Sequence, residues 1–304
     1  MNATLEMKNN IGKKRRRKER WIIFSFLAPN IVGFLIFTLI PVFATGVISL
    51  TEWNLIGEME FVGLENYFKV FETKRFYQVM GNTLFYTIAT VPLGLFLALC
   101  LSVLMNRKIR GITVYRTIYY LPVVSSGVAI AMLWKYLYAD NVGLLAMVWK
   151  FFGAEAPRWL TSTKWSMTAI SIMSVWKGLG GTIVLLLAGL QSISPSYYEA
   201  AKIDGANGWQ QFTNVTIPLL TPTLFFQLIM SIINSFQVFD ATAILTEGGP
   251  GFSSTSIVYY IYTSAFKDLK FGYACALAMV LFFIILVITL VQWLGQKKWV
   301  NYDA

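Results

Sequence analysis

Polar side chains stand inside two long apolar stretches of this chain, at positions 167–190 and 219–245. In the second stretch, four positions have the spacing of three and four residues that places side chains on one face of a helix. They are Ser231, Asn234, Ser235 and Val238. The first stretch contributes Ser174, Trp176, Lys177, Gly178 and Gly181. Polar groups in a membrane are unfavourable unless they face a bundle interior or a wet cavity, so these residues predict the lining of a solute path. The alternative is that small and polar residues only hold helices together.

The chemistry of this predicted lining matches a carbohydrate. An indole ring offers an apolar face, while hydroxyl and amide groups form the hydrogen bonds that the hydroxyl rim of a sugar needs. Lys177 adds a positive charge, which is unfavourable in mid-span unless it is paired or hydrated. Three explanations stay open for it. They are an ion pair with Asp240, a position from which the long side chain reaches water, and an unpaired charge that favours an anionic solute such as a uronate oligosaccharide or a phosphorylated polyol.

Several kinds of chemistry are excluded by residues that the chain lacks. It contains no histidine, which removes the commonest metal ligand and the usual general base at neutral pH. Cys100 and Cys275 fall in apolar stretches, where we expect them to pack as small apolar residues rather than form a disulfide or a metal pair. No Gly-x-x-x-x-Gly-Lys-Ser/Thr phosphate loop occurs. We therefore expect no catalytic residue, no metal site and no cofactor in this chain, so that any ATP and Mg would be bound by a partner.

Six apolar segments are long enough to hold these residues across a bilayer. A hydrocarbon core about 30 Å thick needs roughly 20 apolar residues per helical crossing, and the chain is 56% hydrophobic and 13% charged, with a mean hydropathy of +0.59. The predicted spans are 22–50, 83–105, 114–137, 167–190, 219–245 and 273–294. We expect Pro29 and Pro41 to bend or interrupt the first span, and the run 248–251 (Gly-Gly-Pro-Gly) to end the fifth near Thr246. This pattern predicts an all-α polytopic membrane protein with six transmembrane helices.

Basic residues gather on one side of this six-span arrangement. Residues 1–20 form a polar tail with the basic run 13–18, more bases occur at 107–110 after the second span, and Lys297 and Lys298 follow the sixth. Acidic residues are concentrated in the loop 51–81 on the other side. The positive-inside rule therefore places the tail and both termini in the cytoplasm. The basic run is explained as a topology and lipid-surface signal, and nucleic-acid binding is not expected because no soluble fold accompanies it.

A polar insert at 191–217 separates the fourth and fifth spans on the predicted cytoplasmic side. Ser194 can cap a helix whose first turn is opened by Pro195, and Gly205 can end that helix in the left-handed conformation. A second short helix would then lead to Pro218, which can open the next span. The insert therefore predicts a helix–Gly–helix loop, called the coupling loop below.

The coupling loop contains the sequence Glu-Ala-Ala-Lys-Ile-Asp-Gly at 199–205. It closely resembles the Glu-Ala-Ala loop of the membrane permease subunits of binding-protein-dependent ABC importers. The resemblance implies that the ATPase subunit binds the permease at this loop. The residues implied in this contact are Glu199, Ala200, Ala201, Asp204 and Gly205.

Five shorter sequence motifs also resemble the sugar-permease branch of that family. They are 63–67, 81–83, 121–122, 188–193 and 248–251. The resemblance implies a permease domain over 21–304 in a prokaryotic cell membrane, paired with a second, homologous permease. It also implies two ATPase subunits that bind ATP and Mg, a solute-binding protein outside the cell, and contact between the predicted lining and a sugar.

Two other classes of membrane protein are alternatives to this prediction. A secondary transporter or channel is the main alternative, although it needs no coupling loop and usually shows internal repeats or proton-coupling acidic groups in its spans. A single acidic residue within the predicted spans, Asp240, is weak evidence for proton coupling. A membrane enzyme is disfavoured by the missing histidine and by the lack of paired acidic residues within the spans.

Overall fold

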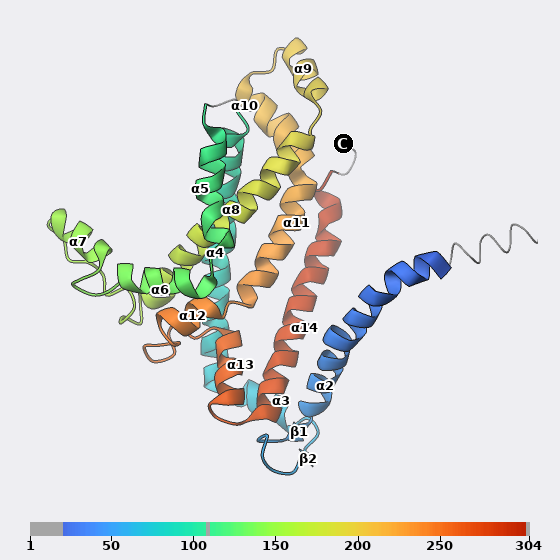
Figure 1. Ribbon diagram of the computed structural model, residues 1–304, viewed down its shortest axis with the longest axis vertical. Coiled ribbons are helices and arrows are strands. Elements are labelled where there is room, and N and C mark those ends of the chain that lie inside the picture. The colour runs from blue at the N-terminus through green and yellow to red at the C-terminus, as the bar shows by residue number, and fades with distance from the viewer. Residues whose placement is uncertain (1–20, 108–109, 302–304) are drawn as a thin grey trace, which may run out of the picture.

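The computed structural model describes residues 21–107 and 110–301, and helices predominate among them (Figure 1). The basic run at 13–18 lies outside these residues. The elements in chain order are the helix Trp21–Ile48, which includes the π turn η1 (Leu35–Leu39) and α2 (Ile40–Ile48), then β1 (Thr51–Glu52), β2 (Glu60–Phe61), α3 (Glu65–Glu72), α4 (Lys74–Met105), α5 (Ile112–Val124), α6 (Gly127–Leu137), α7 (Leu144–Phe151), α8 (Ser166–Ser192), α9 (Pro195–Ile203), α10 (Gly208–Gln211), the π turn η2 (Phe212–Thr216), α11 (Ile217–Phe236), α12 (Asp240–Leu245), α13 (Ile257–Phe266), α14 (Phe271–Gly295) and the 3-10 turn η3 (Gln296–Lys298).

Five of these helical stretches are long and apolar enough to cross a membrane, and a sixth span results if the bent pair α5–α6 is counted as one. The five are Trp21–Ile48, Lys74–Met105, Ser166–Ser192, Gly208–Leu245 and Phe271–Lys298. The prediction of an all-α polytopic membrane protein is confirmed. The small antiparallel pair β1–β2, with Thr51 opposite Phe61, is the one sheet among the described residues.

The third predicted span differs from a straight crossing, because α5 and α6 meet at 99°. At this corner Ser125 has an extended backbone, and Ser126, with φ −55° and ψ 130°, is not helical either. The Ser125 hydroxyl donates to the carbonyl of Leu121 at 2.9 Å, which satisfies an acceptor at the end of α5 without a further helical turn. The continuous span 114–137 is therefore wrong in shape.

The first helix runs through Pro29 without interruption and widens into η1 just ahead of Pro41. A proline cannot donate to the carbonyl four residues earlier and its ring needs space there, which a π turn provides. Figure 1 shows this helix leaning away from the others beyond α2, which contacts α14. None of its most apolar window is buried within the chain.

The bundle is built around α4 and α8, which pack together more extensively than any other described pair. The coupling loop, with α9 and α10, lies at one end of the long axis, and β1, β2 and α3 lie at the other (Figure 1). The C-terminal segment returns to the coupling-loop end, where the ring of Trp299 packs edge-on against Phe225 and the N–H of Asn301 donates to Thr221 at 2.9 Å.

Candidate functional site

The first helix of the coupling loop, α9, begins as the sequence predicts. The Ser194 hydroxyl accepts a hydrogen bond from the N–H of Ser196 at 3.4 Å, and Pro195 occupies the first turn. Proline is tolerated there because the N–H that it lacks would have no helical partner. The predicted cap is confirmed.

The end of α9 also has the predicted left-handed residue, because Gly205 has φ +80°. Its N–H donates to the carbonyl of Lys202 at 3.0 Å, and the N–H of Ala206 donates to the carbonyl of Ala201 at 2.8 Å. This is the double hydrogen-bond pattern that satisfies the last carbonyls of a helix. Asn207 and Gln210 then exchange hydrogen bonds that cap α10.

Pro218 lies in the first turn of α11, as the sequence predicts, but no break in the helix precedes it. The helix that begins as α10 continues through the π turn η2 into α11. Pro218 cannot donate to the carbonyl of Asn214, and the wider turn before it leaves space for its ring. The coupling loop and the fifth span are therefore joined by one continuous helix.

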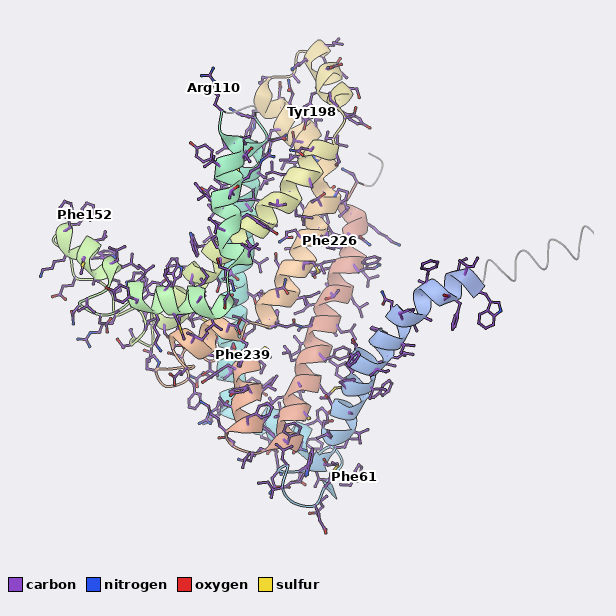
Figure 2. The ribbon with its side chains drawn as sticks, in the orientation of Figure 1. Phe61, Arg110, Phe152, Tyr198, Phe226 and Phe239 are labelled. Carbon is purple, nitrogen blue, oxygen red and sulfur yellow. The ribbon has the colours of Figure 1, made fainter. Side chains whose placement is uncertain are left out.

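The residues predicted to meet an ATPase lie on the surface of the coupling loop. Those exposed are Glu199, Ala200, Asp204 and Gly205, and Ala201 is half-buried. The Tyr198 hydroxyl lies 3.1 Å from that of Thr216 and links α9 to η2 (Figure 2).

Two large apolar side chains on this loop were not selected from the sequence. Ile203 leaves 87% of its surface exposed and Trp209 leaves 71% exposed. They are the most exposed large apolar side chains of the coupling loop. Their isolation in a polar segment was the signal that could have identified them.

A cavity of about 420 Å³ lies among α4, α8 and α11, and an adjoining cavity of about 520 Å³ lies between α8, the start of α6 and the segment that joins α11 to α12. They are called the first and second inner cavities. The residues that line both are Tyr86, Ser174, Gly178, Gly181 and Asn234. Ser231 and Ser235 line the first, and Lys177 and Val238 line the second. Trp176 lines neither, because its ring packs against Trp134 with centroids 5.6 Å apart.

The first inner cavity has a polar network that includes residues missed in the sequence analysis. Gln227 donates through Nε2 to Thr182 at 2.8 Å and to Ser231 at 3.2 Å. Thr182 stands eight residues after Ser174 on α8, and this helical spacing could have indicated it. Ser235, by contrast, is buried and donates to Thr87 on α4 at 2.9 Å, so its hydroxyl holds two helices together.

Val238 does not share the helix face expected from its spacing. α11 ends at Phe236, and Val238 belongs to the link between α11 and α12. The hydroxyl of Ser256 donates to the carbonyl of Val238 at 2.6 Å. This contact with a distant segment replaces the hydrogen bond that would have continued the helix, so the predicted face is limited to Ser231, Asn234 and Ser235.

Lys177 and Asp240 approach each other at the edge of the second inner cavity. The Lys177 ammonium nitrogen lies 2.8 Å, and a carboxylate oxygen of Asp240 2.9 Å, from the point that a β-carbon on Gly127 would occupy. Gly127 and Asp240 are the first residues of α6 and α12, so both helix N-termini favour the carboxylate. Among the described residues the two charges form no direct ion pair.

Residues 90–300 match the family described as the binding-protein-dependent transport system inner membrane component. The chain belongs to this family. The permease is 34% identical over 96% of both lengths to the probable ABC transporter permease protein YesP of Bacillus subtilis. It is 32% identical to the trehalose/maltose transport system permease protein MalF of Thermococcus litoralis, over 94% of this chain and 97% of that protein.

The fold of the permease is also similar to that of solved importers. In the crystal structure of a bacterial ABC transporter involved in the import of the acidic polysaccharide alginate, a chain superposes with a TM-score of 0.81 at 24% identity, over 93% of this chain and 98% of that one. The protein is thus a multi-pass membrane component of an ABC importer, which is a transport function rather than an enzymatic one.

Proposed function

We propose that this permease translocates a sugar or oligosaccharide that an extracytoplasmic binding protein delivers. The observation that carries the proposal is the pair of inner cavities, whose walls combine apolar surface with hydroxyl, amide and tyrosine groups, because such polar groups in a wet cavity can replace the water around a sugar. Relatives named as trehalose/maltose and lactose permeases support this class of solute.

The proposal includes partners at both ends of the molecule. Two ATPase subunits, which bind ATP and Mg, meet the coupling loop at its exposed Ile203 and Trp209. Lipid and a second, homologous permease cover the apolar surface of Trp21–Ile48. The binding protein contacts the opposite end, near β1, β2 and α3.

The proposed orientation places the coupling loop and both termini in the cytoplasm of a prokaryotic cell. Arg110 lies at the coupling-loop end (Figure 2), as do Lys297 and Lys298 in η3, which follows α14. The acidic residues Glu58 and Glu60 lie in the loop at the other end. This distribution supports the orientation because basic residues are retained on the cytoplasmic side.

The charges around the second inner cavity favour a neutral sugar over an anionic one. A solute that reaches Lys177 also meets Asp240, since both side chains converge on Gly127. A sugar hydroxyl can accept from the ammonium and donate to the carboxylate, whereas for an anionic solute repulsion by Asp240 would offset the attraction by Lys177. The proposed solute is therefore an uncharged saccharide.

The proposed path is tested by Asn234→Ala and Ser231→Ala in the full importer reconstituted in vesicles. Each removes a hydrogen bond worth about 1 kcal/mol, so we expect uptake of labelled neutral saccharides to fall roughly fivefold without loss of assembly. Thr117→Ala is the matched control, because Thr117 is exposed on α5 and its hydroxyl bonds only to Thr113 within the same helix. Uptake unchanged by both cavity variants would place the path elsewhere.

The neutral character of the solute is tested by Lys177→Met and Asp240→Asn, singly and together. For a neutral sugar each single change should lower uptake, because it leaves the other charge uncompensated, and the double change should recover part of the loss. Uptake of a uronate oligosaccharide by the wild-type importer, lost in Lys177→Met, would contradict the assignment and indicate an anionic solute.

A further inference from the structure

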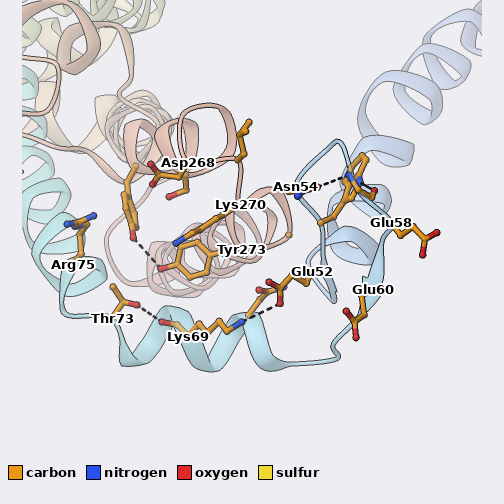
Figure 3. A pocket seen from close by; sticks show the side chains of 17 residues that line it. Glu52, Asn54, Glu58, Glu60, Lys69, Thr73, Arg75, Asp268, Lys270 and Tyr273 are labelled. Carbon is orange, nitrogen blue, oxygen red and sulfur yellow. Dashed lines mark hydrogen bonds and ion pairs between the residues drawn. The ribbon is translucent and has the colours of Figure 1, made fainter.

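A large pocket lies at the end of the molecule opposite the coupling loop. This outer pocket has a volume of about 840 Å³ and lies between the loop that holds β1 and β2, the helix α3, and the junction of α13 and α14 (Figure 3). Lys69 on its wall pairs with Glu65 at 2.8 Å and with Glu52 at 3.7 Å. The hydrogen bond that the Lys69 ammonium donates to the Glu65 carboxylate raises the pKa of Lys69 above its usual value. The outer pocket therefore has a polar, charged rim.

A continuous row of aromatic side chains joins the outer pocket to the second inner cavity. In order from the outer pocket, the row consists of Trp53, Phe271, Phe266, Tyr262 and Phe239. The centroids of successive rings are 5.5, 6.0, 5.3 and 5.2 Å apart. Trp53 lines the outer pocket, and Phe239 lines the second inner cavity beside Lys177. The row thus has each of its ends in a cavity.

The middle of the row is open on one side and supported on the other. Phe266 leaves 58% of its surface exposed and Tyr262 leaves 38% exposed. Tyr259 is 4% exposed and stacks against Tyr262 with the ring planes 29° apart. A buried ring thus fixes the orientation of an exposed one, which is the property of a preformed binding surface.

The direction of the row distinguishes it from the aromatic belt of a membrane protein. Belt residues gather at the depth of the lipid headgroups, around the circumference of the protein. The elements that supply this row instead succeed one another along the long axis, from the loop beside β1 through α13 to the link before α12 (Figure 1). Its length, and the cavity at each end, match a path for a solute rather than an anchor in the lipid surface.

We propose that the aromatic row is a binding track for saccharides between the outer pocket and the inner cavities. The inference rests on the proposed function. A sugar ring has an apolar face that packs on an aromatic ring, while its hydroxyl rim stays in contact with water. Successive rings about one sugar unit apart allow a saccharide to move from one to the next without leaving the apolar surface. Tyr262 adds a hydroxyl halfway along.

The test compares substitutions that keep or remove the flat ring at one position. Phe266→Leu keeps an apolar side chain against lipid or protein but removes the aromatic face, whereas Phe266→Tyr retains it. In the full importer, with a panel of labelled neutral mono- to tetrasaccharides and their loaded binding protein, we expect Phe266→Leu to lower uptake roughly two- to tenfold. Phe266→Tyr should transport at nearly the wild-type rate, and ATP hydrolysis without solute should be unchanged in both.

A matched control is available on α14. Phe282 leaves 45% of its surface exposed and packs against Phe283 with centroids 5.4 Å apart, but it lines none of the cavities described above. Phe282→Leu should leave uptake unchanged. Equal uptake by Phe266→Leu and Phe266→Tyr would refute the track while leaving the proposed function intact. If the wild-type importer takes up no saccharide of the panel, the proposed function fails and the track with it.

Discussion

Replacement of Gly205 by alanine isolates one property of the coupling loop, namely its left-handed backbone. Gly205 has φ +80° at the end of α9, and a β-carbon built on it would meet no other atom within 4 Å. Crowding therefore contributes nothing to the substitution. The effect on the loop comes only from the backbone conformation that a side chain disfavours.

The expected magnitude follows from that conformation. A residue with a β-carbon in the left-handed region is destabilised by about 1–2 kcal/mol, so Gly205→Ala should shift the equilibrium away from the native helix end roughly 5- to 30-fold. Gly205→Asn should be milder, because asparagine tolerates this region. Gly205→Pro should abolish coupling, since proline cannot take φ +80° and lacks the N–H that donates to Lys202 at 3.0 Å.

The assay is co-purification of the ATPase subunits with the permease, followed by ATP-driven uptake in vesicles. Gly208→Ala is the control, because Gly208 lies in the same loop, has no positive φ, and offers the same open space to a methyl group. We expect Gly208→Ala to behave as wild type and uptake to decrease in the order Asn, Ala, Pro at position 205. Wild-type uptake by normally expressed Gly205→Pro would refute the reasoning.

Two further predictions concern packing and topology. Gly180→Ala should lower the melting temperature of the permease in detergent, because its methyl group would overlap the backbone carbonyl of Tyr119 and force α5 from α8 at a cost of about 1–3 kcal/mol. Gly181→Ala should leave the melting temperature unchanged, because its methyl group would make only an ordinary van der Waals contact with Val123. A cysteine introduced at Glu60 should react with a membrane-impermeant reagent in intact cells, and one at Asn207 should not; the reverse pattern would invert the proposed orientation.

Local chemistry explains why the coupling loop could be predicted in detail from the sequence. Ser194, Pro195 and Gly205 each act on the backbone within a few residues of their own position. The end of the fifth span could also be predicted from local sequence, since the glycine–proline run 248–251 cannot continue a helix. The last helix of this span, α12, ends at Leu245. No distant contact is needed to set any of these boundaries.

The features that were missed depend on partners far away in the chain. The link after Phe236 is held by a hydrogen bond from Ser256 to Val238. The start of α6 brings Gly127 against Lys177 and Asp240, which come from two other helices. Trp176 was selected for its indole, but its position is set by packing against Trp134 rather than by the cavity. Hydrophobic periodicity contains no information about such contacts.

The continuous helix from α10 to α11 suggests how the two proposed sites communicate. Trp209 lies in the coupling loop and Ser231 lines the first inner cavity, and at 1.5 Å per residue the helix separates them by about 33 Å. If an ATPase moves α10, a rigid helix transmits that movement to the cavity lining without an intervening hinge. The π turn η2 is the one segment between Gly208 and Phe236 that is not α-helical, and the hydrogen bond between Tyr198 and Thr216 links that turn to α9. Both α9 and α10 therefore contact η2, the turn from which α11 extends to the first inner cavity.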